Sequence, residues 1–230
     1  MQKLFASLCL TIALVAPLTA QTNAPVAAAP NAEADYAAKI TARTLDITKL
    51  LALDDATKSN HVFATLTGQY RALRDWHEFN DGKLKTLAKS ASDEDKAAVE
   101  KIRASLVVQR EKFLTALAAD LTPTQVEQVK DKMTYNKVQV TFNAYKEIIP
   151  TLTEPQQAHI LELLKAAREE AIDGGSADEK SAVFKKYKGK INNYLSKEGV
   201  DEAKARQEWA AKQKPKKPSE AVAQPADAAK

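Results

Sequence analysis

The sequence predicts an all-α protein, a single helical bundle of about six or seven helices with a disordered N-terminal linker and a disordered C-terminal tail. Two observations support this fold class. Between residues 32 and 211 apolar side chains recur every three or four positions, the spacing of one face of a helix. Gly and Pro are scarce in this body and fall between the apolar stripes. Helices with one apolar face bury that face against one another, and a bundle is the result.

The two ends of the chain differ in composition from the body. Residues 1–20 combine an early Lys, a short apolar run and a small final residue, the pattern of a signal peptide cleaved near Ala20. Residues 21–31 are rich in Ala and Pro and indicate a linker. Residues 212–230 form a Lys/Pro/Ala tail that cannot bury enough surface to fold. We therefore expect a periplasmic or secreted protein, without a transmembrane segment after cleavage, whose body is one domain.

Apolar stripes predict the helices of the body in chain order. The segment from Val138 to Phe142 alternates like a strand, but it also fits a helical stripe that continues to Tyr145 and Ile149. We expect a helix there because a lone strand has nothing to pair with. The other stripes are Tyr36, Ile40, Ile47, Leu51; Val62, Leu66, Tyr70, Leu73; Val99, Ile102, Leu106, Phe113, Leu117; Ile160, Leu163, Leu164, Ala167; and Phe184, Tyr187, Ile191, Tyr194.

Capping residues predict where helices begin and end. Ser92 precedes three acidic residues, which suit the positive end of a helix dipole. Ser176 and Glu179 have the spacing of a capping box, in which each side chain binds the backbone amide of the other residue. Helix ends are also expected at Gly82, Gly174 and Gly199.

Charge and cysteine content exclude several classes of function. The formal net charge is +4, but the signal peptide and the tail carry all of it, so the body is neutral and nucleic acid is not an expected partner. The only cysteine, Cys9, lies in the signal peptide. The mature chain therefore has no disulfide and no cysteine-based metal site, and we expect no cofactor.

Two Leu-Thr-x-x-Gln stretches, Leu121–Gln125 and Leu152–Gln156, resemble the repeated signature of the Spy-type periplasmic chaperones. This resemblance implies an alternative function as a periplasmic chaperone or envelope-stress adaptor, with an exposed apolar surface for clients. Helix capping also explains both stretches, because Thr is a good N-cap and Gln three residues later closes a capping box.

Two groups of residues suggest catalysis or metal binding but fall short of it. His77 and Asp81 begin like a zinc-protease helix, but Asp81 stands where the second His is needed, so a His–Asp hydrogen bond is expected and no metal site. Glu169, Glu170 and Asp173 lie close together on one segment, whereas glycoside hydrolysis needs two acids facing each other across a sugar. We therefore expect no catalytic residue and no enzyme.

Two unusual stretches, Ala167–Ser176 and Phe184–Leu195, contain poor helix formers among Tyr, Asn, Lys and Asp. Gly189 in the second stretch indicates a close backbone approach or a break in the helix. The polar and aromatic residues are of the types that bind sugar rings and hydroxyls. The alternative is that the tyrosines only lie at the edge of the core.

Five segments in fixed order resemble the bacterial exported family named domain of unknown function 3826. The likeness covers the body from about Tyr36 to Asp201, and it implies one domain that binds sugar. The segments are Met133–Tyr135, Thr141–Tyr145, Ile149–Thr153, Ala167–Ser176 and Lys186–Leu195.

These observations lead to the hypothesis of a non-catalytic carbohydrate-binding protein, an accessory protein of glycan utilisation whose partner is a polysaccharide or oligosaccharide. Aromatic rings would stack on sugars, while Asp173 and Asn192 would hold hydroxyls. A plain scaffold, in which the same residues only pack, stays open, and the sequence does not indicate an oligomeric state. The candidate ligand-binding residues are Tyr135, Tyr145, Arg168, Asp173, Tyr187, Lys188, Asn192 and Tyr194, with Trp76, His77 and Asp81 as neighbours.

Overall fold

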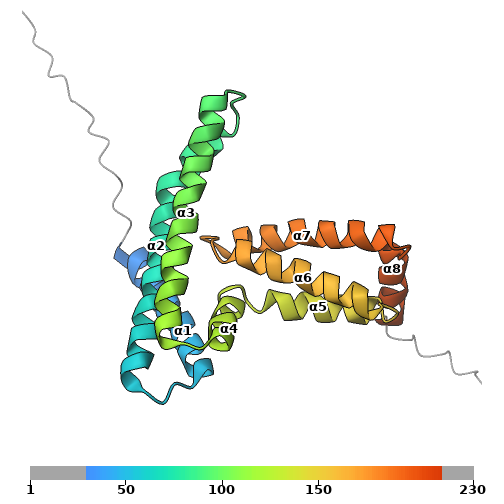
Figure 1. The fold of residues 1–230 in the computed structure, drawn as a ribbon, viewed down its shortest axis with the longest axis horizontal. Helices are drawn as coiled ribbons and strands as arrows, with labels where there is room; N and C mark the ends of the chain where they lie inside the picture. The colour runs from blue at the N-terminus through green and yellow to red at the C-terminus, as the bar shows by residue number, and fades with distance from the viewer. Residues whose placement is uncertain (1–29, 214–230) are drawn as a thin grey trace, which may run out of the picture. The chain divides into compact units, whose positions relative to one another are not determined.

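The computed structural model describes residues 30–213 and contains eight helices and no strand in that range, which confirms the all-α class (Figure 1). The chain divides after Ala37 into two units, and every contact described below lies within the second. None of the helices in this range is both long and apolar enough to cross a membrane. The helices are α1 (Pro30–Leu51), α2 (Ala56–Leu87), α3 (Asp93–Asp120), α4 (Pro123–Met133), α5 (Lys137–Ile148), α6 (Glu154–Ala171), α7 (Ala177–Lys197) and α8 (Glu202–Gln213).

The helices pack along the stripes that the sequence predicts. Helix α2 lies along α3, and α6 lies between α5 and α7, while α8 contacts α5 and α7 (Figure 1). The short helix α4 contacts α3 and α6. One core cluster joins α5, α6 and α7 and includes Tyr145, Ile160, Leu164, Phe184 and Ile191. The segment from Val138 to Phe142 is helical, as expected, because its apolar face completes this cluster.

Most predicted helix starts are confirmed. The Ser92 side chain accepts from the amide of Asp95. Thr122 with Gln125, and Thr153 with Gln156, form complete capping boxes. These contacts satisfy backbone amides that the first turn of a helix leaves free.

Three glycine and capping predictions need correction. Gly82 does not end a helix, because α2 continues to Leu87; a helical Gly costs only about 1 kcal/mol, which packing on α3 offsets. Gly189 marks neither a break nor a close approach, since α7 is continuous and a Cβ there would meet no atom of the described residues within 4 Å. The Ser176 hydroxyl accepts from the Glu179 amide, but the Glu179 carboxylate binds the amide of Gly175 instead of closing the capping box.

Candidate functional site

The turn between α4 and α5 holds an aromatic ring at the surface on strained backbone. Tyr135 has φ of 60° and Asn136 has φ of 53°, both in the left-handed region. Such a conformation costs about 1–3 kcal/mol per residue, and Asn tolerates it better than Tyr. Tyr135 nevertheless stays 39% exposed, so its burial is only partial. Strain of this kind persists only where the surrounding contacts impose it.

Hydrogen bonds from α7 and from within the turn itself fix this turn. The buried Lys180 on α7 donates from Nζ to the carbonyl of Met133, over 3.0 Å. Thr134, fully buried, donates its hydroxyl to the carbonyl of Lys130 over 2.8 Å. The amide of Asn136 donates to the carbonyl of Asp131 over 2.7 Å. Burial lowers the pKa of Lys180 to about 8, and the nearby Arg43 charge acts in the same direction.

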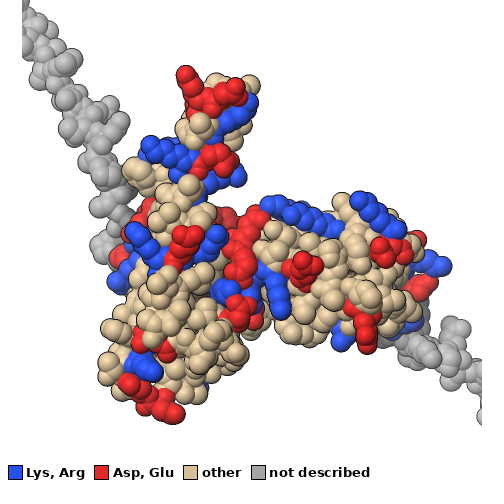
Figure 2. Space-filling view, in the orientation of Figure 1, with Lys and Arg blue, Asp and Glu red and all other residues tan. Residues whose placement is uncertain are grey.

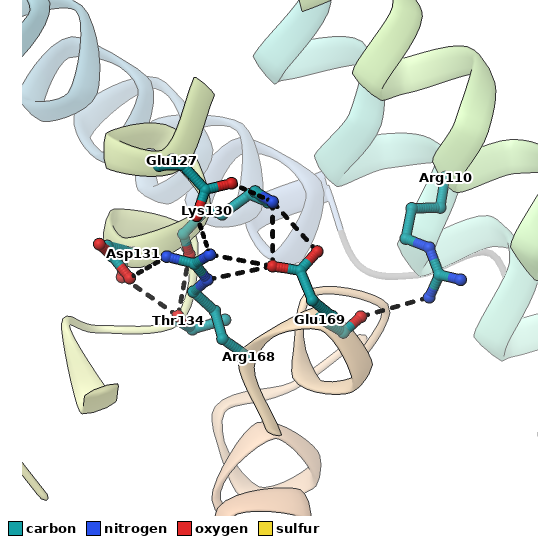
Figure 3. A network of polar contacts seen from close by, with 7 residues as sticks. All are labelled: Arg110, Glu127, Lys130, Asp131, Thr134, Arg168 and Glu169. Atoms are coloured by element: carbon teal, nitrogen blue, oxygen red, sulfur yellow. Dashed lines mark hydrogen bonds and ion pairs between the residues drawn. The ribbon is translucent and has the colours of Figure 1, made fainter. Parts of the chain in front are cut away.

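An ionic network fastens α4 to α6 (Figure 3). Arg168 on α6 is 4% exposed and donates to Asp131 over 2.7 Å, to Glu169 over 3.0 Å and to Glu127. Lys130 donates to both carboxylate oxygens of Glu169, over 2.9 and 3.1 Å, and pairs with Glu127. Arg168 on α6 thus binds carboxylates of α4, and Lys130 on α4 binds a carboxylate of α6, so both cations join the two helices.

The network is electrostatically satisfied. Burial lowers the pKa of Arg168, but hydrogen bonds to Asp131, Glu127 and Glu169 outweigh this effect and raise it above its ordinary value. The pKa of Glu127 is lowered, because bonds to Lys130 and Arg168 outweigh the opposing effect of burial. A buried guanidinium with this many acceptors holds α4 and α6 in one arrangement.

A cavity of about 240 Å³ lies beside the Tyr135 ring. The guanidinium of Arg43 lies 5.7 Å from the ring centroid, a cation–π contact that orients the ring. Asp46 and Lys132 add an acceptor and a donor, and Tyr70 adds a second phenol ring. The cavity is smaller than pockets for drug-sized ligands, about 300–1,000 Å³, so it suits one small polar unit. Ile47 and Met133 complete its lining.

Asp173, which follows α6, meets α2 and α3. Its Oδ2 accepts from Arg110 over 2.5 Å, and its backbone carbonyl lies 2.8 Å from His77 Nε2. Arg110 also donates to the carbonyl of Glu169 over 3.2 Å (Figure 3). Burial raises the pKa of Asp173 to about 6, against the opposing charges of Arg110 and Lys180. Its Oδ1 is buried without a hydrogen-bond partner among the described residues.

The buried Tyr145 and the part-buried Asn192 bond to each other away from this region. The Tyr145 hydroxyl donates to Asn192 Oδ1 over 2.6 Å and lies 3.4 Å from the carbonyl of Lys188. Burial raises the pKa of Tyr145 to about 12, and its ring is only 3% exposed. A ring so enclosed cannot stack on a sugar, so this pair serves packing.

The remaining predicted residues make packing contacts on α7 and α2. Tyr187 packs on the core edge, with Lys190 Nζ 4.1 Å from its ring centroid. Tyr194 packs against His159, with ring centroids 4.2 Å apart. Trp76 donates its indole N–H to Ser105 over 2.9 Å and so joins α2 to α3. Figure 2 shows Lys and Arg along α7, among charges of both signs over the rest of this face.

The structure therefore brings the predicted residues together in groups and not on one face. Sequence reasoning missed Arg43, Asp46 and Tyr70 beside Tyr135, because no local pattern relates α1 and α2 to the α4–α5 turn. The structural roles of Lys180 and Arg168 could have been found from the sequence, because each is a charged residue on the apolar face of a predicted helix. The groups are His77, Asp81 and Asp173, with Trp76 beside His77; Tyr145, Lys188 and Asn192; and Tyr187 and Tyr194 at the edge of the core cluster that contains Tyr145, while Arg168 lies in the ionic network and Tyr135 in the turn that follows α4.

Comparison with known proteins bears on the family and not on the ligand. No curated protein matches this chain. Residues 37–215 match a family described as "Protein of unknown function (DUF3826)", and this range spans all of α2 to α8. The chain therefore belongs to the DUF3826 family.

Proposed function

We propose that this protein is an exported, non-catalytic carbohydrate-binding protein that takes a sugar unit in the cavity beside Tyr135. The observation that carries the proposal is the Tyr135 ring, kept at the surface by two consecutive residues with positive φ. Left-handed backbone that presents a partly exposed aromatic ring supports the proposal, because such conformations cluster at functional sites.

The chemistry around the ring fits a sugar. An exposed phenol ring can stack on the C–H face of a pyranose. Arg43 and Lys132 offer donors and Asp46 offers an acceptor at the edge of the same cavity. Sugar hydroxyls donate and accept at once, so a mixture of the two kinds of group is required to hold them.

The absence of catalysis is part of the proposal. Asp46 is the one carboxylate among the described residues that line the cavity. Hydrolysis of a glycosidic bond needs two carboxyl groups on opposite sides of the sugar. The carboxylates of Glu127, Asp131 and Glu169 already accept hydrogen bonds from Arg168 or Lys130.

The chaperone alternative has no specific observation in its favour. Both Leu-Thr-x-x-Gln stretches begin helices with complete capping boxes, and that role accounts for the Thr and the Gln in each. Export rests on residues 1–20, which lie outside the described residues, so the periplasmic or secreted location is proposed from the sequence pattern alone.

The test is a glycan array of plant and microbial polysaccharides, probed with residues 21–230. Tyr135→Gly removes the ring and relieves the left-handed strain, whereas Asn136→Gly relieves strain next door and keeps the ring. We expect binding by the parent chain and by Asn136→Gly, and a loss of at least tenfold for Tyr135→Gly with no fall in thermal midpoint. No binding to any glycan, or equal binding by both variants, would contradict the proposal.

A further inference from the structure

Three potential metal ligands meet where α2 faces the start of α7. His77 Nδ1 lies 3.1 Å from Asp81 Oδ1, the contact expected one helical turn apart on α2. It also lies 3.5 Å from Oε2 of Glu179, more than one hundred positions later in the chain. All three side chains are part-buried, and their ligand atoms lie within 4.8 Å of one another. The sequence showed one carboxylate beside His77, and the fold supplies the second.

The orientation of the His77 ring is fixed by its other nitrogen. Nε2 lies 2.8 Å from the backbone carbonyl of Asp173. A carbonyl oxygen only accepts, so Nε2 must carry a hydrogen and donate it. In a neutral imidazole Nδ1 then holds the lone pair, and here it points toward two carboxylate oxygens. A donated N–H to a backbone carbonyl is the usual second contact of a histidine that binds a metal ion through its other nitrogen.

Two neighbours hold the ring in this position. Trp76 meets it edge-on, with ring centroids 5.0 Å apart. Gly175 lies so close to the ring that a Cβ there would come within 2.7 Å of the imidazole. The ring therefore has little freedom to turn Nδ1 away from the carboxylates.

The carboxylate of Glu179 does not bind the Ser176 amide, as it would in a capping box, and lies beside His77 instead. Its position after Ser176 suits a capping box, yet its carboxylate binds the amide of Gly175 over 2.8 Å and lies beside Nδ1. Each carboxylate oxygen has two lone pairs, so Oε2 can accept from Gly175 and still bind a cation.

We propose that His77, Asp81 and Glu179 bind a divalent transition-metal cation of the zinc class. Zinc takes imidazole nitrogen and carboxylate oxygen at about 2.0–2.2 Å. At angles between tetrahedral and right-angled, such bonds place neighbouring ligand atoms about 2.9–3.4 Å apart. The distance of 3.1 Å falls in this range and that of 3.5 Å lies just above it.

The surroundings leave room for water to complete the coordination. A cavity of about 320 Å³ opens over the three side chains. Arg74 also lines this cavity, and its Nε lies 3.3 Å from Asp75 Oδ1 and 3.8 Å from Glu78 Oε1. This site is separate from the Tyr135 cavity and does not depend on carbohydrate binding.

The test is calorimetric titration of metal-stripped residues 21–230 with zinc chloride, together with the visible absorption of added cobalt(II). Glu179→Gln keeps an oxygen for the Gly175 amide but removes the charge. Asp178→Asn removes the same charge from the neighbouring position of α7 and serves as the control. We expect one zinc per chain, affinity lowered at least tenfold by His77→Gln and Glu179→Gln, and affinity within twofold of the parent for Asp178→Asn.

Thermal unfolding gives a second readout. Zinc should raise the midpoint of the parent and of Asp178→Asn but not of Glu179→Gln, with circular dichroism showing equal helix content. The proposal is overturned by the absence of saturable one-to-one binding or by equal affinity in Glu179→Gln and Asp178→Asn. It is also overturned if magnesium or calcium displaces zinc at equal concentration, because a site with an imidazole ligand prefers the transition metal.

Discussion

Replacing Arg168 with Met tests whether the ionic network holds α4 against α6. Arg168 is 4% exposed and donates to three carboxylates, on Glu127, Asp131 and Glu169. Removing one member of a buried ion pair costs about 3–5 kcal/mol, and a single hydrogen bond to a charged group contributes about 1.5–3 kcal/mol. The three carboxylates keep between 37% and 46% of their exposure, so water can solvate them after the change. We therefore expect a loss near the lower limit, about 3 kcal/mol in the free energy of unfolding.

The assay is urea unfolding followed by circular dichroism, with Lys186→Met as the matched control. Lys186 pairs with Glu170 on the surface, with side chains 54% and 42% exposed, and such pairs contribute about 1 kcal/mol or less. The loss for Arg168→Met should also depend on pH. The folded pKa of Glu127 lies below its ordinary value of 4.5, so its contribution is present above that pH and is lost as the pH falls through the folded value. A loss below about 1 kcal/mol, a loss equal to the control, or a loss that stays constant as the pH is lowered step by step from 4.5 until the chain unfolds would refute the reasoning.

Three further predictions follow from single contacts. Gly189→Ala should stabilise α7 by about 0.5–1 kcal/mol because its Cβ has open space, whereas Gly175→Ala should destabilise because its Cβ meets the His77 ring; thermal unfolding of both variants checks the opposite signs. Tyr145→Phe should lower the free energy of unfolding by about 1 kcal/mol at neutral pH, because the bond to Asn192 is lost. The folded pKa of Tyr145 is raised to about 12, so the difference in unfolding free energy between parent and variant should shrink between pH 10 and 12. A difference that stays constant in urea unfolding over this range would contradict the prediction. Lys180→Met should release the Met133 carbonyl and speed hydrogen exchange of the Tyr135 amide at least tenfold, and unchanged exchange would show that Lys180 does not hold the turn.

The helices were predictable because burial of one face repeats along the chain at the helical period. The apolar stripe through Phe184, Tyr187 and Ile191 predicted α7. The helical spacing from Val138 to Tyr145 correctly predicted a helix there and not a strand. The helix end predicted at Gly82 was wrong, because a glycine weakens a helix by only about 1 kcal/mol. The packing of the flanking residues decides whether the helix continues.

The site was predictable only where it is local. The His77–Asp81 contact follows from helical spacing, and the Tyr135 segment stands out through its resemblance to the family. Glu179 beside His77 and Arg43 beside Tyr135 join segments far apart in sequence, and one sequence contains no signal for such pairs. The left-handed backbone at Tyr135 was equally hidden, because contacts elsewhere in the fold impose it against the preference of the residue.

The measurement that tests the account most directly is the map of amide chemical-shift changes when the best glycan from the array is added to labelled residues 21–230. The account predicts that the largest changes fall on Arg43, Asp46, Tyr70, Lys132 and Tyr135, which line one cavity. Changes centred instead on the cavity at Trp209, or around Lys188 and Arg206, would contradict it.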